Sequence, residues 1–208
     1  MQEHEYALLG GLNRSKLGRY LNLLAAAISA AIVFALLSAV DFAKRLGIPA
    51  NLPPVVLSLA SAASVFGALY WLFDKYAWKW PKLGMLLKVP DLSGDWHCDG
   101  QTINADKSLG YVWEAKITII QTWDKIRVRL STKQSGSNSV AAALLCDEAD
   151  GYHLLYHYKN DPNIAEPDLT SHRGFAELIF SKDRKSGHGE YFNGHGRYTF
   201  GTMKLRKL

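Results

Sequence analysis

The chain opens with two long apolar segments and then changes to short alternating runs. Residues 21–40 and 55–73 carry no charged side chain. As a helix, each segment is long enough to cross the roughly 30 Å hydrocarbon layer of a bilayer. A cleavable signal peptide would have a shorter, earlier apolar run, with no second run after it. The pattern therefore predicts two transmembrane helices within a membrane part that covers residues 1–90.

Small residues recur at four-residue spacing on both predicted helices, at Ala27 and Ala31 and again at Ala60 and Ser64. Small side chains allow helices to approach closely in lipid, where the hydrophobic effect does not drive helix association. Two uses fit this spacing. The small residues can pack the two helices against each other within one hairpin, or they can pack helices of different protomers.

From residue 91 the pattern is typical of an all-β domain, which we place at residues 91–208. Short runs rich in alternating apolar residues are separated by polar or Gly-rich turns, and no segment has a helical period. The eight predicted strands are residues 94–101, 111–122, 125–132, 139–147, 152–159, 174–180, 189–192 and 197–206. Sequential strands with short connections favour an eight-stranded meandering barrel, because closure removes the exposed sheet edges.

Alternation also predicts which side chains line this barrel. The inward sets of the second and third strands are Trp113, Ala115, Ile117, Ile119, Gln121 and Trp123, and then Ile126, Val128 and Leu130. Gln121 is the exception, since it is a polar side chain on an otherwise apolar face. Gly94, Asp95 and Trp96 open the first strand in a way that resembles lipocalin-like barrels, in which a Trp closes one end.

The positive charge of the chain is concentrated in its membrane part. Residues 1–90 carry nine Lys and Arg against four acids, whereas residues 91–208 carry fifteen of each sign. The barrel is therefore not a general polyanion-binding surface, and we expect neither DNA nor RNA as a partner. Basic residues are more numerous beyond the outer ends of the two apolar segments than in the loop between them. Both termini are therefore expected in the cytoplasm.

The residues that catalysis or a metal site needs do not come together in this sequence. Cys98 and Cys146 are the only cysteines, and a cytosolic barrel would keep both reduced. His153 and His157 lie four apart on a strand, about 13 Å along one face, which is too far to share an ion. There is no nucleophile elbow, no phosphate-binding loop before a helix and no paired carboxylates. We therefore expect neither an enzyme nor a metal or cofactor.

Polar and aromatic residues gather near the ends of the predicted strands. Aromatic faces can stack on bases, hydroxyls and amides can bond base edges, and an Arg can pair with phosphate. We expect a mouth there that binds a small, polar, partly aromatic ligand. The predicted ligand-binding residues are Gln121, Trp123, Ser135, Ser137, Ser139, Tyr156, Tyr158, Asn160, His172, Arg173, Tyr191 and Arg197.

The order of motifs resembles a family of bacterial effectors. After the two apolar segments come Asp91-Leu92-Ser93-Gly94-Asp95-Trp96, Ile120-Gln121-Thr122-Trp123 and the run 135–139, followed by Tyr156-His157-Tyr158, His172-Arg173-Gly174, Gly189-Glu190-Tyr191-Phe192 and Gly201-Thr202-Met203-Lys204-Leu205. This series is similar to the two-transmembrane, β-strand-rich (SMODS-associated) effectors of cyclic-oligonucleotide-based anti-phage signalling systems (CBASS). The resemblance covers most of the chain.

The resemblance implies a barrel that senses a cyclic dinucleotide made by a partner synthase during phage infection. It also implies a protein of the bacterial inner membrane that forms a homo-oligomer on activation, disrupts the lipid bilayer and kills the infected cell. Two other functions remain open from the residues alone. One is a membrane-tethered, lipocalin-like receptor for a small apolar ligand, and the other is a hydrolase with an unrecognised site. The polar residues at the predicted mouth favour the nucleotide.

Overall fold

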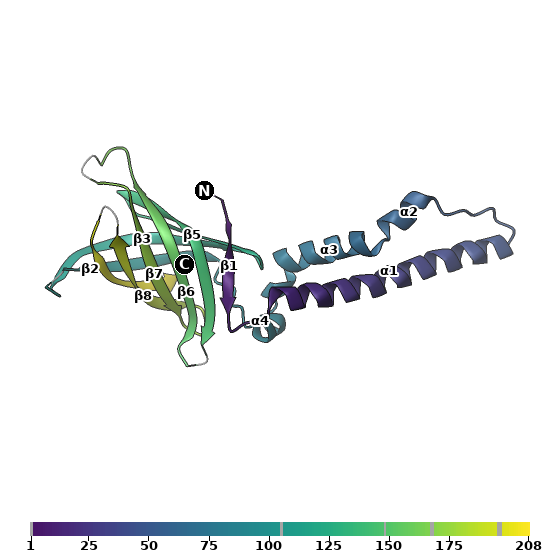
Figure 1. Ribbon diagram of the computed structural model, residues 1–208, viewed down its shortest axis with the longest axis horizontal. Coiled ribbons are helices and arrows are strands. Elements are labelled where there is room, and N and C mark those ends of the chain that lie inside the picture. The colour runs from purple at the N-terminus through teal and green to yellow at the C-terminus, as the bar shows by residue number, and fades with distance from the viewer. Residues whose placement is uncertain (1, 105, 148, 167–168, 195–196) are drawn as a thin grey trace. The chain divides into compact units, whose positions relative to one another are not determined.

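A computed structural model of the chain describes residues 2–104, 106–147, 149–166, 169–194 and 197–208. It contains two compact units. Residues 12–78 form a helical unit. Residues 1–11 and 79–208 form a β-rich unit (Figure 1). The first residues of the chain thus belong with the β domain, although the sequence placed them in the membrane part.

All eight predicted strands are present, and their ends lie within four residues of the predicted ends. They are β2 (Gly94–Ile103), β3 (Leu109–Gln121), β4 (Lys125–Ser131), β5 (Ser135–Asp147), β6 (Gly151–Pro162), β7 (His172–Phe180), β8 (Ser186–Gly194) and β9 (Phe200–Lys207). Consecutive strands pair antiparallel, and β2 pairs with β9 to continue the ring into a closed barrel. Because consecutive strands run in opposite directions, β3, β5, β7 and β9 all begin at one end, called the mouth here, and the other end is the base.

The prediction of eight strands is wrong by one, because β1 (His4–Leu9) also belongs to the barrel. The strands β4 and β5 pair directly only near the mouth, where residues 129–131 meet residues 136–138. Toward the base they separate, and β1 fills the gap. It pairs antiparallel with the start of β4, at His4 and Glu5, and parallel with residues 142–145 of β5. The closure of the barrel is therefore uneven.

Large apolar side chains fill the base of the barrel. Trp96, Trp123 and Phe180 are fully buried, and the rings of Trp96 and Phe180 meet edge to face with centroids 4.8 Å apart. The indole Nε1 of Trp96 donates to the carbonyl of Leu92, 3.1 Å away. The expectation that Trp96 closes one end of the barrel agrees with these contacts.

The helical unit differs from the expected pair of continuous helices. The first predicted span lies within α1 (Arg14–Arg45), which is long and apolar enough to cross a membrane. The second is divided into α2 (Pro54–Leu59) and α3 (Ala62–Lys75). Among the described residues, α1 is the one helix that meets both criteria, so the expectation that the second span is one continuous helix is corrected. Ser61 starts α3 as its N-cap, with its Oγ accepting from the N–H of Ser64.

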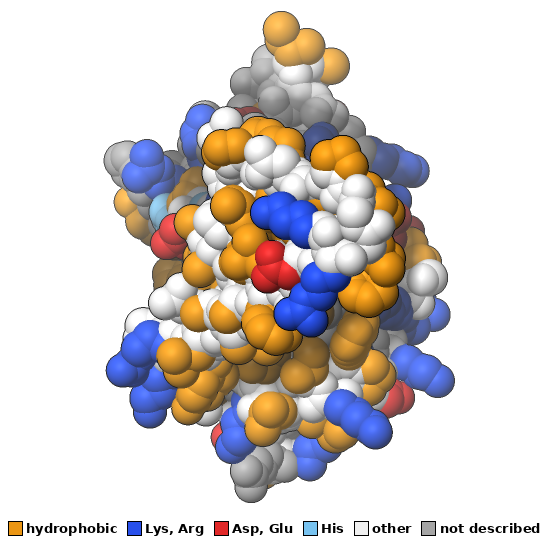
Figure 2. Space-filling model, turned by 90° about the vertical axis from the view of Figure 1, so that its right-hand side faces the viewer, with side chains coloured by type: hydrophobic (Ala, Val, Ile, Leu, Met, Phe, Trp, Pro, Cys, Tyr) orange, Lys and Arg blue, Asp and Glu red, His pale blue; other side chains and the backbone are white. Residues whose placement is uncertain are grey.

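Helices α1 and α3 pack together, and on α1 the contact uses residues that the sequence did not select. Ala25 and Ser29 of α1 are buried, and the Ser29 hydroxyl donates to the carbonyl of Ala60 at the break between α2 and α3. Ala27 and Ala31 are exposed. The hairpin therefore buries a different face of α1 from the one that carries these two residues. Many hydrophobic side chains lie on the protein surface in Figure 2, as is typical of helices that face lipid.

A short 3-10 turn at Ala77–Lys79 and helix α4 (Pro81–Leu87) lead from the hairpin to the barrel. Helix α4 is followed by Lys88, its C-cap, which adopts a left-handed conformation with a φ of 54°. Within the β-rich unit, the Lys79 Nζ pairs with the Asp91 carboxylate at 3.5 Å and also donates to the Ser93 hydroxyl. These contacts hold Lys79 against the segment that enters β2.

Candidate ligand pocket

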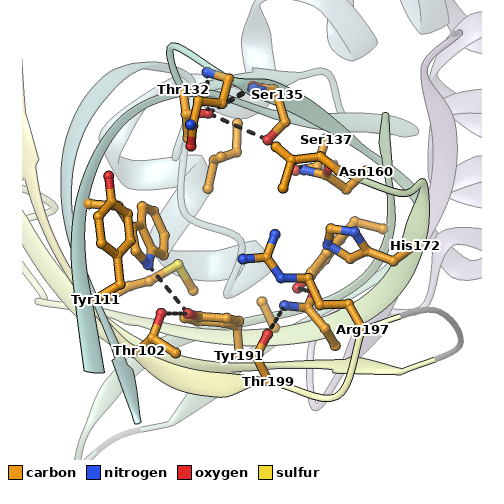
Figure 3. A pocket seen from close by; sticks show the side chains of 18 of the residues that line it. Thr102, Tyr111, Thr132, Ser135, Ser137, Asn160, His172, Tyr191, Arg197 and Thr199 are labelled. Carbon is orange, nitrogen blue, oxygen red and sulfur yellow. Dashed lines mark hydrogen bonds between the residues drawn. The ribbon is translucent and has the colours of Figure 1, made fainter. Parts of the chain in front are cut away.

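A cavity of about 530 Å³ opens at the mouth of the barrel (Figure 3). Side chains from every strand of the β2–β9 meander line it. Its size is in the range of cavities that hold small molecules. Eight of the predicted ligand-binding residues line it: Ser135, Ser137, Tyr156, Tyr158, Asn160, His172, Tyr191 and Arg197.

One side of the cavity is aromatic. The rings of Trp113 and Tyr191 meet edge to face at 5.6 Å, and the Trp113 Nε1 donates to the Tyr191 hydroxyl at 3.3 Å. That hydroxyl also lies 3.0 Å from the Thr102 hydroxyl. Trp113 can occupy this place because its partner across the sheet is Gly100, where a Cβ atom would collide with the indole ring. These hydrogen bonds fix the orientation of both aromatic rings.

A second group of aromatic, amide and hydroxyl side chains comes from β6, β8 and the residue before β9. The rings of Tyr156 and Tyr158 are tilted, with centroids 5.9 Å apart. The Tyr158 hydroxyl donates to the Asn193 Oδ1 at 2.8 Å, and the Asn193 Nδ2 donates to the Thr199 hydroxyl at 2.9 Å. Burial raises the pKa of both tyrosines, so both hydroxyls stay neutral and keep their protons for hydrogen bonding.

Hydroxyl and amide groups lie on the wall formed by β4, β5 and β6. Asn160 donates through its Nδ2 to the Ser135 hydroxyl at 3.2 Å, and the Thr132 hydroxyl donates to the Ser135 carbonyl at 3.1 Å. Ser137 also lines this side and is almost completely buried. Such groups can donate and accept, so the wall can bond the edge of a base or a ribose hydroxyl.

Positive charge enters the cavity at its rim. The guanidinium of Arg197 points into the cavity in Figure 3, and Lys133 lines it from the turn between β4 and β5. Glu114 is the acid among the lining residues. Burial lowers the pKa of His172, and the positive charge of Arg197 acts in the same direction. His172 is therefore neutral at pH 7, and its Nδ1 donates to the Thr170 carbonyl at 3.1 Å.

Gln121 and Trp123 do not lie at the mouth, which corrects the sequence prediction. Gln121 is the last residue of β3 and Trp123 follows it, and this end of β3 lies at the base because antiparallel neighbours place their ends alternately at the two ends of a barrel. Gln121 accepts from the Leu92 N–H at 2.9 Å and donates to the Pro90 carbonyl at 3.1 Å. This polar side chain on an apolar face therefore has a structural role, holding the segment that enters β2.

Ser139 and Arg173 also lie outside the cavity. Ser139 is buried beside β1, where its hydroxyl accepts from the Val128 N–H at 2.9 Å and lies 2.7 Å from the His4 Nε2. Arg173 follows the inward-facing His172 on β7, so its side chain is on the outer face. Selecting polar residues near strand ends therefore did not distinguish these two positions from the positions that face the cavity.

Several lining residues were not predicted as ligand-binding residues. They include Thr102, Tyr111, Trp113, Asn193 and Thr199. Trp113 was assigned to the inward face of its strand but was treated as core. The signal that could have identified it is its place near the start of β3, which puts it at the same end of the barrel as the start of β5 and β7.

Among the described residues, one group of three could hold a metal ion: His97, Asp99 and Glu114, on β2 and β3. It combines an imidazole nitrogen with two carboxylates, a set that suits several divalent metals. Asp99 already bonds His97 at 2.9 Å and pairs with Arg206 at 3.4 Å. The hydrogen bond from His97 lowers the Asp99 pKa. The prediction that the protein needs no metal stays a prediction.

Comparison with known families matches nearly the whole chain. The model of the Cap15 cyclic dinucleotide receptor domain matches residues 87–207, and the model of the Cap15 transmembrane helices matches residues 15–79. The chain belongs to the Cap15 family. It is also 46% identical over 208 residues to CD-NTase-associated protein 15 of Yersinia aleksiciae, covering 100% of this chain and 99% of that protein. The family assignment confirms the resemblance to CBASS effectors and places a membrane domain at the N-terminal end.

Proposed function

We propose that this protein is an anti-phage effector whose barrel binds a cyclic dinucleotide in the mouth cavity. The observation that carries the proposal is the cavity lining, which combines two aromatic groups, hydroxyl and amide side chains and Arg197. Aromatic rings stack on bases, neutral polar groups bond base edges and ribose, and a guanidinium pairs with phosphate. A receptor for an apolar ligand would favour a more uniformly apolar lining.

The ligand contacts proposed here follow the geometry of the cavity. Tyr156, Tyr158 and Tyr191 supply stacking faces or hydroxyls, and His172 supplies a neutral imidazole. Ser135, Ser137 and Asn160 bond the polar edges, and Arg197 pairs with a phosphate. Lys133 is the second cation at the rim, which suits a ligand with two phosphates.

In this proposal, ligand binding drives assembly of the protein and damage to the inner membrane. Both termini lie in the cytoplasm, because basic residues are denser beyond the ends of the hairpin than in its loop. The second crossing is then made by α2 and α3 together. The exposed Ala27 and Ala31 face of α1 is available for close contacts between helices of different protomers.

Calorimetric titration of the full-length protein in detergent micelles tests ligand binding. We expect one or more cyclic dinucleotides to bind, and the linear dinucleotide with the same bases to bind more weakly. Arg197→Ala should weaken binding by about 1–3 kcal/mol, the range of a charge-assisted hydrogen bond. The control is Arg129→Ala, which changes an exposed Arg on β4 outside the cavity. This variant should bind the nucleotide with the affinity of the unchanged protein. Equal affinity in the two variants would contradict the assigned phosphate contact.

The membrane step needs a separate measurement. Full-length protein in lipid vesicles should release a trapped dye only after a binding cyclic dinucleotide is added. The Arg197→Ala variant should require a higher nucleotide concentration for the same release. Ligand binding without any release would retain the receptor function and refute the membrane-disruption step.

A further inference from the structure

An apolar row crosses the outer face of the barrel near its mouth. On β8, Tyr191 lines the cavity, so its neighbour Phe192 points outward. Phe192 pairs across the sheet with Phe175 on β7 and with Phe200 on β9, and the row continues to Ile103 and Leu109. The rings of Phe175 and Phe192 are stacked at 5.7 Å. Phe192 is 56% exposed, Phe200 is 41% exposed and Phe175 is half-buried, so this phenylalanine row (Phe175, Phe192 and Phe200) is partly exposed to solvent.

The charges on the two sides of the phenylalanine row have opposite sign. Two residues toward the base, Glu177 on β7 faces Glu190 on β8 as a cross-strand pair. Two residues toward the mouth, Arg173 on β7 faces Lys159 on β6 in the same way. Like charges directly opposite each other destabilise a sheet. The acidic row (Glu177 and Glu190) and the basic row (Lys159 and Arg173) therefore each contain an electrostatic repulsion within one molecule. Opposite charge supplied by another molecule would offset this repulsion.

Some of this charge is already compensated within the chain. Glu177 bonds His153 at 3.0 Å, and Lys159 pairs with Asp161 at 3.0 Å. Within the described part of the chain, Glu190 and Arg173 have no such partner, and both are exposed. They lie on adjacent strands, about 7 Å on either side of the apolar row, at the spacing of two residues along a strand.

We propose that this outer face is a two-fold interface with a second copy of the chain. A two-fold axis that runs along the phenylalanine row would bring each Phe against the same Phe of the second copy. It would also turn the second copy so that its basic row faces the acidic row of the first. Arg173 of each copy then lies opposite Glu177 and beside Glu190 of the other. An axis parallel to the strands would instead oppose Glu177 with Glu190, so the charges select the first arrangement.

The proposal rests on the proposed function, because it gives the assembly step its contact surface. Two convex barrels meeting along one row bury less than the roughly 1,200–2,000 Å² of a stable interface. Association of free barrels should therefore be weak. The helical hairpin holds all copies in one membrane, which raises their effective concentration and makes a weak contact sufficient.

Charge reversal with complementation tests the geometry. Donor-labelled and acceptor-labelled full-length proteins are placed in lipid vesicles with a binding cyclic dinucleotide, and energy transfer is measured against protein density. Arg173→Glu and Glu190→Arg should each require roughly tenfold more protein for half-maximal transfer, because each reverses charge pairs that occur twice in the dimer. A mixture of the two variants should assemble better than either alone, since Glu at 173 then meets Arg at 190 while the other contact keeps its native charges.

The control is Arg129→Glu, the same charge change on β4, which is separated from β8 by three strands of the ring. It should assemble as the unchanged protein does. Phe192→Ser should weaken assembly without affecting nucleotide affinity, which is measured separately by titration. If both charge reversals assemble like the unchanged protein, or if their mixture assembles no better than each alone, the interface is overturned. In that case the receptor function still stands whenever nucleotide affinity is retained. Loss of nucleotide binding by the unchanged protein would instead refute the proposed function.

Discussion

The two ends of the barrel use the same strand alternation for opposite purposes. At the base, the inward positions are large and apolar, and Trp96 and Phe180 are packed without any solvent exposure. At the mouth, inward positions on the same strands carry Trp113, His172 and other polar or aromatic side chains around a cavity. An inward position on a barrel strand is therefore core or ligand site according to its distance from the base.

Removal of a base aromatic should have the largest effect on stability. Trp96→Ala leaves a cavity beside Phe180 and removes the bond to the Leu92 carbonyl. We expect a loss of about 3–5 kcal/mol in the free energy of unfolding. Trp113→Ala is the matched control at the mouth and should cost less, because Trp113 is already partly exposed. Denaturation of full-length protein in detergent, followed by circular dichroism, would measure both, and equal losses would contradict this contrast.

The polar residue at the base should come next. Gln121→Leu keeps the size of the side chain but leaves the Leu92 N–H and the Pro90 carbonyl without their partner. A buried unpaired polar group costs about 1–3 kcal/mol, so we expect that loss of stability with little change in nucleotide affinity. Gln101→Leu is the control, because Gln101 is only partly buried and lies on the outward face of β2. A fall in affinity without a fall in stability would return Gln121 to the ligand site.

Substitution of a glycine next to the cavity tests the mouth separately from the base. Gly100→Ala places a Cβ against the Trp113 indole, which must move. We expect about tenfold weaker nucleotide binding, equivalent to about 1.4 kcal/mol, because the aromatic side of the cavity shifts. Gly136→Ala is the matched control, since its Cβ would make an ordinary contact 3.6 Å from the Leu130 carbonyl. Calorimetric titration of both variants decides, and unchanged affinity in Gly100→Ala would exclude a role for the Trp113 position.

The sequence predicted local features of this molecule better than long-range ones. Alternation and turn residues located all eight strands of the meander, because those signals lie within each segment. The strand β1 was missed, since six residues far from their partners on β4 and β5 give no local sign of pairing. The helix break was also missed. An uninterrupted apolar run did not show that Ser61 starts a new helix or that Ser29 bonds the Ala60 carbonyl.

The candidate site was predicted in part for a related reason. The candidate residues were chosen by the chemical type of their side chains, and eight of them line the cavity. Selection by nearness to a strand end failed where the direction of the strand was ignored, as for Gln121. It also failed where the face of the strand was ignored, as for Arg173. Direction and face together decide whether a polar residue near a strand end reaches the mouth.

The smallest expected effect concerns the pH dependence of the mouth, through His172. Burial lowers its pKa below the ordinary value of 6.5, Arg197 acts in the same direction, and the Thr170 carbonyl and Asp161 oppose the shift. As the pH falls, His172 therefore binds a proton in the unfolded chain at a higher pH than in the folded one. The contribution of neutral His172 to the free energy of unfolding is fully present above pH 6.5 and is lost as the pH drops toward the lowered pKa. An anionic ligand in the cavity would favour protonated His172, so nucleotide affinity should rise as the pH falls over the same range. His172→Gln should remove both trends, while His188→Gln, on the outward face of β8, should leave them unchanged. Thermal unfolding and titration between pH 5 and pH 8 would measure them, and an affinity that falls on acidification would contradict a phosphate close to His172.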